Sequence, residues 1–154
     1  MKRFIFFMVA AVNLCFADPS VKKVVFDLTS GDVNVLERKI LKGIPHAKNY
    51  YESHFQELET AVVIHGNAYK FFVKHPEQSV FKDDKVVIER RAELSKRLES
   101  LAKTYKTEFL VCSVGMEKHG IKPQDIDDYV LTVASATVGL IDKQNDGYAY
   151  LPAD

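Results

Sequence analysis

The hydrophobic positions of this chain alternate between short apolar runs and longer segments with helical spacing. Val24, Val25 and Phe26 form the centre of the first run, which is nearly continuous and typical of a strand buried on both faces of a parallel sheet. The same kind of pattern predicts strands over residues 21–29, 59–65, 108–112, 129–133 and 148–151. Strands that alternate with helical segments indicate one α/β domain of ordinary size.

The helical segment after the first strand has a clear start and an expected interruption. Asp32 follows Gly31 and is a candidate N-cap. Leu36 and Ile40 then recur at helical spacing, and we expect Gly43 and Pro45 to break the helix before a second stretch over residues 47–55.

Three more helices follow from the same reasoning. Asn67 is a candidate cap for a short helix, and the polar residues 74–84 are predicted to form a loop. The longest helix has one apolar face and one charged, solvated face, and a helix of small residues covers 134–145. The apolar face of the long helix consists of Val87, Leu94, Leu98, Leu101 and Tyr105.

The first seventeen residues have the three parts of an export signal. Lys2 and Arg3 precede an apolar stretch over residues 4–16, and Cys15 and Ala17 supply small residues before a cleavage site at Asp18. The apolar stretch is shorter than the roughly 20 residues of a membrane anchor. We therefore expect a leader at 1–17, a single mature domain over 18–154, and a periplasmic or otherwise exported protein without a membrane anchor.

Charge excludes one class of partner. The chain has 21 basic and 21 acidic residues, and loss of Lys2 and Arg3 leaves 19 basic against 21 acidic. The expected mature chain therefore carries a net charge of about −2 and lacks the basic field that nucleic-acid binding requires.

Cys112 is the one cysteine that remains after removal of the leader, because the chain has only two. It ends the predicted strand 108–112 and is followed by a turn at residues 113–115. An exported thiol without an intramolecular partner stays free, pairs between chains or carries another group. A small hydrophobe packed in the core is the alternative interpretation.

The carboxyl ends of parallel strands meet at one edge of a sheet, where open α/β folds bind ligands. This placement makes His65 the candidate partner of a Cys112 thiolate, and the start of a helix after residue 115 would stabilise that anion. The polar residues predicted to line the same cleft are Ser30, Asn67, Ser113 and Ser135.

A copper site is the competing interpretation of the cysteine segment. Cys112, Met116 and His119 are spaced four and three residues apart, and thiolate, thioether and imidazole suit Cu(I). Cys112 is predicted in a strand, however, and spacing without matching geometry is weak evidence. The sequence has no zinc-type HExxH, no nucleotide-binding glycine fingerprint and no Gly-x-Ser-x-Gly elbow. We therefore predict no metal and no cofactor.

Four segments together resemble the DsrE/DsrF-like family of sulfur-relay proteins, in its exported single-domain branch. They are VVFDLTSGD at 24–32, VVIHG at 62–66, FLVCSVGMEKHGI at 109–121 and DGYAYLP at 146–152. The resemblance implies a three-layer α/β/α fold, flavodoxin-like in outline, on a five-stranded, mainly parallel sheet. It also implies homo-oligomers, often trimers or hexamers, and a persulfide carried by the cysteine that Cys112 matches.

Two functions follow as hypotheses. The first is a sulfur-handling protein, a sulfurtransferase-like carrier in which Cys112 exchanges sulfur with a donor or acceptor protein or a small sulfur species. The second is an oligomeric module that binds a ligand or protein, with a non-reactive cysteine. Seven aromatic residues in the middle third pack either a subunit interface or the core: Tyr50, Tyr51, Phe55, Tyr69, Phe71, Phe72 and Phe81.

Overall fold

The structure, a computed structural model, describes residues 21–154. The predicted leader at 1–17 lies outside the described residues. Within residues 21–154, no helix is long and apolar enough to span a membrane.

Five parallel strands form the centre of the fold. They are β1 (Val21–Leu28), β2 (Glu57–Ile64), β3 (Glu108–Cys112), β4 (Val130–Val133) and β5 (Ala149–Ala153). The sheet order is β4-β3-β2-β1-β5, and all four pairings are parallel. The predicted, mainly parallel sheet is therefore confirmed, and every strand ends at the same edge.

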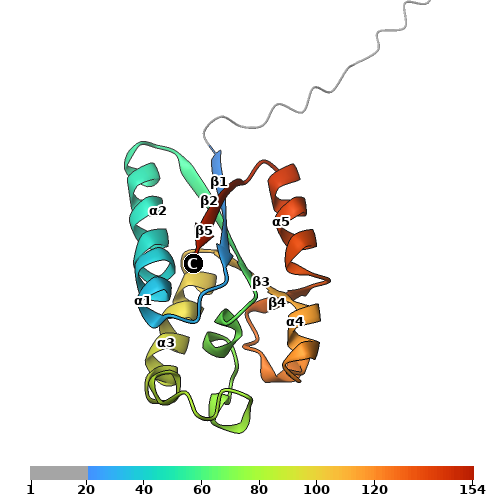
Figure 1. Cartoon of the computed structure of the whole chain (residues 1–154). Coiled ribbons are helices and arrows are strands. Elements are labelled where there is room, and N and C mark those ends of the chain that lie inside the picture. The colour runs from blue at the N-terminus through green and yellow to red at the C-terminus, as the bar shows by residue number, and fades with distance from the viewer. Residues whose placement is uncertain (1–20) are drawn as a thin grey trace, which may run out of the picture.

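Helices cover both faces of this sheet, as Figure 1 shows. One side carries α1 (Val33–Val35), the π-helix η1 (Leu36–Lys42), α2 (Gly43–Ser53) and α3 (Lys85–Lys103), and the other carries α4 (Ser113–Lys118) and α5 (Ala136–Asn145). Gly139 of α5 lies so close to the sheet that a Cβ there would come within 3.6 Å of Val63 Cγ2. The expected three-layer α/β/α architecture is confirmed.

The predicted interruption at Gly43 and Pro45 is wrong. Residues 33–53 are helical throughout, although the hydrogen-bonding pattern changes from α to π at Leu36 and back to α at Gly43. Pro45 is the third residue of α2 and directly follows the π-helical stretch, where the regular α-helical bonding from residue i to i−4 is already replaced by the π pattern. The missing proline donor therefore does not break the helix. Asp32 does cap it, accepting a hydrogen bond from the Asn34 backbone N–H at 2.8 Å.

Short 3₁₀ helices occupy the connections. They are η2 (Ala68–Phe71), η3 (Pro76–Gln78) and η4 (Pro123–Asp125). The short helix predicted after Asn67 is η2, but the Asn67 side chain does not cap it. Instead, the backbone N–H of Asn67 donates to Thr29 O at 2.9 Å and ties η2 to the end of β1. The predicted loop at 74–84 contains only η3.

The aromatic residues divide between the core and the surface. Tyr69, Phe71 and Phe72 are each at most 1% exposed, so they pack the core. Phe55 is 96% exposed and Tyr50 is 57% exposed. Tyr51 and Phe81 are half-buried. The core interpretation therefore holds for the η2 aromatics, while those at the end of α2 remain available for a partner.

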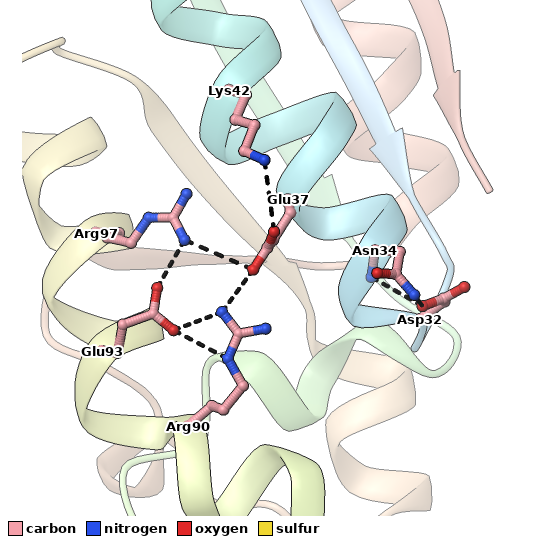
Figure 2. A network of polar contacts seen from close by, with 7 residues as sticks. All are labelled: Asp32, Asn34, Glu37, Lys42, Arg90, Glu93 and Arg97. Atoms are coloured by element: carbon pink, nitrogen blue, oxygen red, sulfur yellow. Dashed lines mark hydrogen bonds and ion pairs between the residues drawn. The ribbon is translucent and has the colours of Figure 1, made fainter.

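An ion-pair network joins the π-helix to α3 (Figure 2). The carboxylate of Glu37 accepts a hydrogen bond from Arg90 Nη2 at 2.5 Å and lies 3.7 Å from Arg97 Nη1. Glu93 accepts hydrogen bonds from both arginines, at 2.6 Å each. Hydrogen bonding to Arg90 lowers the pKa of Glu37 against the effect of burial. The members of this network are partly exposed. Their contacts join η1 to α3.

Candidate functional site at the carboxyl edge of the sheet

Cys112 is the last residue of β3 and the N-cap of α4. Its backbone is extended, with φ −71° and ψ 116°, and α4 begins at the next residue. The turn predicted at residues 113–115 is therefore the first turn of α4 itself. The side chain of Cys112 is 6% exposed and belongs to the main core cluster. The thiol lies at the end of the core, where the strand gives way to a helix.

Two opposing effects set the pKa of the Cys112 thiol. Burial raises it, whereas the neighbouring Gly115 N–H, the Tyr69 hydroxyl and the Ala136 and Val114 N–H groups lower it by stabilising the thiolate. The lowering effects prevail, so the pKa lies below its ordinary value. Backbone N–H groups in the first turn of a helix have no carbonyl partner in that helix. The thiol lies among such groups from two helices, α4 and α5.

Ser113 and Ser135 hold these two helix starts together. Ser113 Oγ donates a hydrogen bond to Ala134 O at 2.7 Å. Ser135 caps α5 by accepting from the Val138 N–H at 3.1 Å. The structure therefore brings both predicted serines close to the cysteine in the fold. The Ser113 bond joins the start of α4 to the residue before the α5 cap, and the Ser135 bond fixes the start of α5.

His65 lies on the same sheet face as Cys112, one strand away. Val63 pairs with Leu110 in the parallel register, and successive side chains of a strand point to opposite faces. The residues two positions later, His65 and Cys112, therefore lie on the same face as that pair. The imidazole Nε2 of His65, however, bonds to Asp27 Oδ1 at 2.6 Å. The other oxygen of Asp27 accepts from the Tyr150 hydroxyl at 2.8 Å. His65 is thus held by β1, and the side chain that hydrogen-bonds at Cys112 is Tyr69.

Ser30 and Asn67 belong to a different part of the edge. Ser30 Oγ accepts a hydrogen bond from the Asp32 N–H at 3.1 Å and shapes the turn after β1. Asn67 is exposed and packs against Gly31, where an added Cβ would lie 2.9 Å from the Asn67 Cβ. Ser30 therefore lies in the connection after β1, and Asn67, in the connection after β2, contacts the Thr29 and Gly31 residues on either side of it.

Tyr69 and Gly115 are the site residues that the sequence did not identify. The Tyr69 hydroxyl donates to Cys112 O at 3.0 Å, across 43 positions of the chain. A Cβ on Gly115 would lie only 1.9 Å from the Tyr69 hydroxyl oxygen. A glycine one turn into a helix beside a buried tyrosine was the available signal, but no sequence spacing connects the two.

Two of the three residues of the competing copper interpretation pack against other side chains. Met116 is 2% exposed and packs in the core, while the His119 ring lies 5.4 Å from the ring centroid of Tyr69. Among residues 21–154, no group of three or more His, Cys, Asp or Glu side chains is placed to hold a metal ion. His119 instead lines a cleft of about 650 Å³, together with His75, Lys82 and Asp125.

Comparisons with known proteins agree with this architecture. An uncharacterised protein of Aquifex aeolicus (strain VF5) is 28% identical over 159 aligned positions, which cover 99% of this chain and 64% of that relative. The chain thus spans just under two thirds of the relative's length. A solved structure of a protein of unknown function from Methanobacterium thermoautotrophicum matches with a TM-score of 0.60 and 20% identity, covering 85% of this chain and 98% of the other.

A family comparison adds to these two similarities. The DsrE/DsrF-like family matches residues 23–153, a range that begins in β1 and ends in β5. It includes every strand of the sheet together with Cys112 and Tyr69. The chain therefore belongs to the DsrE/DsrF-like family.

Proposed function

We propose that this protein carries sulfur as a persulfide on Cys112. The observation that carries the proposal is the place of the thiol at the end of β3 and at the start of α4, where helix-start N–H groups lower its pKa despite burial. A thiolate is the form that attacks sulfur, and reactive cysteines lie in electropositive, partly exposed surroundings that lower their pKa. Membership in a sulfur-relay family supports the same chemistry.

The transfer step conserves atoms and electrons. The Cys112 thiolate attacks the outer sulfur of a donor persulfide R–S–SH. A bond forms between Sγ and that sulfur, and the donor S–S bond breaks. The products are Cys112–S–SH and the thiolate R–S⁻, with no net oxidation. The reverse reaction, with an acceptor thiolate attacking the outer sulfur, discharges the carrier.

The surroundings of the thiol suit a carrier better than an independent catalyst. Burial at 6% exposure protects a bound persulfide from bulk solvent. His65, the nearest predicted base along the edge, is engaged with Asp27. The proposal therefore assigns activation of donor and acceptor to partner molecules, and assigns to this chain the holding of one sulfur atom.

Intact-mass spectrometry tests this function. The purified chain carrying Cys15→Ser, in which Cys112 is the one remaining thiol, is incubated with polysulfide. We expect a mass gain of one or more sulfur atoms that dithiothreitol removes. The matched control, Cys15→Ser with Cys112→Ser, gains nothing. An unchanged mass in the first protein, or equal gain in both, contradicts the proposal.

Export and sulfur exchange outside the cytoplasm are part of the proposal. The charged start, apolar stretch and small residues before Asp18 support it. Expression of the full chain followed by fractionation and N-terminal sequencing tests it. We expect the periplasmic protein to begin at Asp18, and a cytoplasmic protein beginning at Met1 contradicts export.

Self-association is the remaining part. Tyr50 in the last turn of α2 and Phe55 just beyond its end are exposed, and such aromatics are enriched at subunit interfaces. Light scattering after size exclusion tests it. We expect a trimer or hexamer, and a monomer over the whole concentration range contradicts that assembly.

A binding module is the second candidate, and the cleft beside His119 is the observation that favours it. The cleft measures about 650 Å³ and includes imidazole, ammonium and carboxylate groups. In that case Cys112 is a core residue, and the mass experiment above gives no sulfur gain in either protein.

A further inference from the structure

The side chain of Tyr69 comes from the segment after β2, yet its hydroxyl ends at the Cys112 backbone. Tyr69 belongs to η2, is 1% exposed, and donates to Cys112 O at 3.0 Å. A buried phenol needs a hydrogen-bond partner. The chain satisfies this need at the one residue that ends β3 and caps α4.

Gly115 shows that this approach is built into the fold. A Cβ on this residue would lie 1.9 Å from the Tyr69 hydroxyl oxygen and 2.6 Å from Cζ. Its backbone lies within the helical α4 and is not among the glycines with positive φ. Glycine inside a helix costs roughly 0.5–1 kcal/mol relative to alanine. Its place here is therefore explained by space for the phenol rather than by backbone conformation.

The ring of Tyr69 is fixed as well as its hydroxyl. The ring centroid of His119, at the C-terminal end of α4, lies 5.4 Å from that of Tyr69. The ring centroid of Phe81 in turn lies 6.0 Å from that of His119. The phenol is thus held between η2 and α4. Rotation about its C–O bond is the motion that remains, because the ring itself is packed.

We propose that Tyr69 is a positioning residue for the Cys112 thiol, whose hydroxyl proton turns from Cys112 O to the sulfur when the thiolate or persulfide anion forms. The inference rests on the proposed function. A phenol carries one proton, so it serves the carbonyl while the thiol is neutral and the sulfur once that atom is charged. Hydrogen bonds to charged groups are the stronger ones.

The electrostatic coupling of the two side chains supports this geometry. Burial is the main cause of the raised pKa of Tyr69, and its interaction with Cys112 raises it further. The same interaction lowers the pKa of the thiol. The other titratable groups nearby are His119, against the phenol ring, and His65, on the neighbouring strand of the same sheet face.

The test is the rate of Cys112 alkylation by iodoacetamide against pH, in the Cys15→Ser background. We expect the parent protein to show a midpoint below the ordinary thiol value of about 8.5. Tyr69→Phe removes only the hydroxyl and is expected to raise the midpoint by about one pH unit, the effect of one hydrogen bond to an anion. Tyr129→Phe is the matched control. It removes a hydroxyl bonded to Asp127 at 2.9 Å, away from the thiol, and leaves the midpoint unchanged.

Gly115→Ala is the second variant and keeps the tyrosine. The new methyl group displaces the phenol from Cys112, so the midpoint also rises, and this result stands if Tyr69→Phe does not fold. A low midpoint in the parent that stays the same in both variants overturns the role of Tyr69 and leaves the persulfide proposal intact. An ordinary midpoint in the parent overturns the proposed function itself.

Discussion

Cys112 and Asp127 are both buried ionisable residues close to a strand end, yet the fold treats them in opposite ways. Cys112 is 6% exposed and Asp127 is 8% exposed. Burial raises the pKa of each group. At Cys112 the hydrogen bonds outweigh burial and the pKa falls, whereas at Asp127 burial outweighs Arg91 and Tyr129 and the pKa rises. Two residues with similarly small exposed fractions therefore have opposite tendencies to ionise.

The partners explain this difference. Asp127 accepts from Arg91 Nη2 at 2.5 Å and from the Tyr129 hydroxyl at 2.9 Å, and its backbone N–H donates to Phe72 O. These contacts join η2, α3 and the segment before β4. The groups that lower the Cys112 pKa are backbone N–H groups and one phenol, and none of them is charged. The Asp127 carboxylate is thus engaged in contacts that join three parts of the fold. The N–H groups around Cys112 can instead stabilise a negative charge on its sulfur.

We expect the largest loss of stability at Arg91, and its substitution tests the structural side of the comparison. Arg91→Met leaves the buried carboxylate of Asp127 without its ionic partner, and such a loss costs about 3–5 kcal/mol of unfolding free energy. Urea denaturation measures it. Arg91→Met combined with Asp127→Leu removes both charges and is expected to recover much of the loss. Equal destabilisation in the single and double variants contradicts a structural ion pair.

Gly115→Ala is expected to have the next largest effect and tests the thiol side. The methyl group overlaps the Tyr69 hydroxyl, and overpacking of this kind costs about 1–3 kcal/mol. Thermal or urea unfolding measures the loss. Gly120→Ala is a reference for glycine replacement at the end of the same helix, where a Cβ meets nothing within 4 Å but the φ of +64° is strained. No loss in Gly115→Ala shows that the phenol does not need this space.

We expect the ion-pair network around Glu37, shown in Figure 2, to contribute less to stability than the Arg91–Asp127 pair. Its members are partly exposed, with 35% of the Arg90 side chain and 22% of the Glu37 side chain accessible. Arg90→Gln is expected to cost at most about 1 kcal/mol, and less at high salt, because solvent screens exposed ion pairs. Urea denaturation at low and high salt measures it. A loss as large as that of Arg91→Met contradicts this ranking.

The smallest effect is the pH dependence of stability that Cys112 contributes. Its pKa is lower in the folded than in the unfolded protein, so the unfolded chain binds more protons between the two values. Stability from this group therefore rises with pH through that window and is lost as the pH falls through the folded pKa. The unfolding free energy of the parent relative to Cys112→Ser should increase as the pH rises toward 9. A constant or falling difference contradicts the lowered pKa.

Local sequence patterns predict some features of this structure. Apolar runs such as Val62–Ile64 fix buried strands, because few other structures bury consecutive apolar residues. Cys112 was recognisable because it is a lone thiol at the end of such a run. The family match to residues 23–153 confirms the resemblance seen in four segments.

Other features depend on contacts between distant parts of the chain. Pro45 indicates a break, but it lies directly after a π-helix within a helix that continues to Ser53. Asn67 has a typical capping side chain, yet its backbone bond to Thr29 decides its position. The meeting of Tyr69 with Gly115 joins segments whose separation gives no periodic signal. Local patterns therefore predict the sheet and the thiol, while the groups that tune the thiol emerge only from packing.

The most direct test of the central claim is whether the 6% exposed thiol reacts in the folded protein. The alkylation rate of Cys112 at pH 7, in the Cys15→Ser background, is measured at urea concentrations below the unfolding transition. Reaction from the native state predicts a rate that stays nearly constant with urea. A rate that rises in parallel with the unfolding equilibrium constant shows that the thiol reacts only after unfolding, and that result contradicts a carrier role for Cys112.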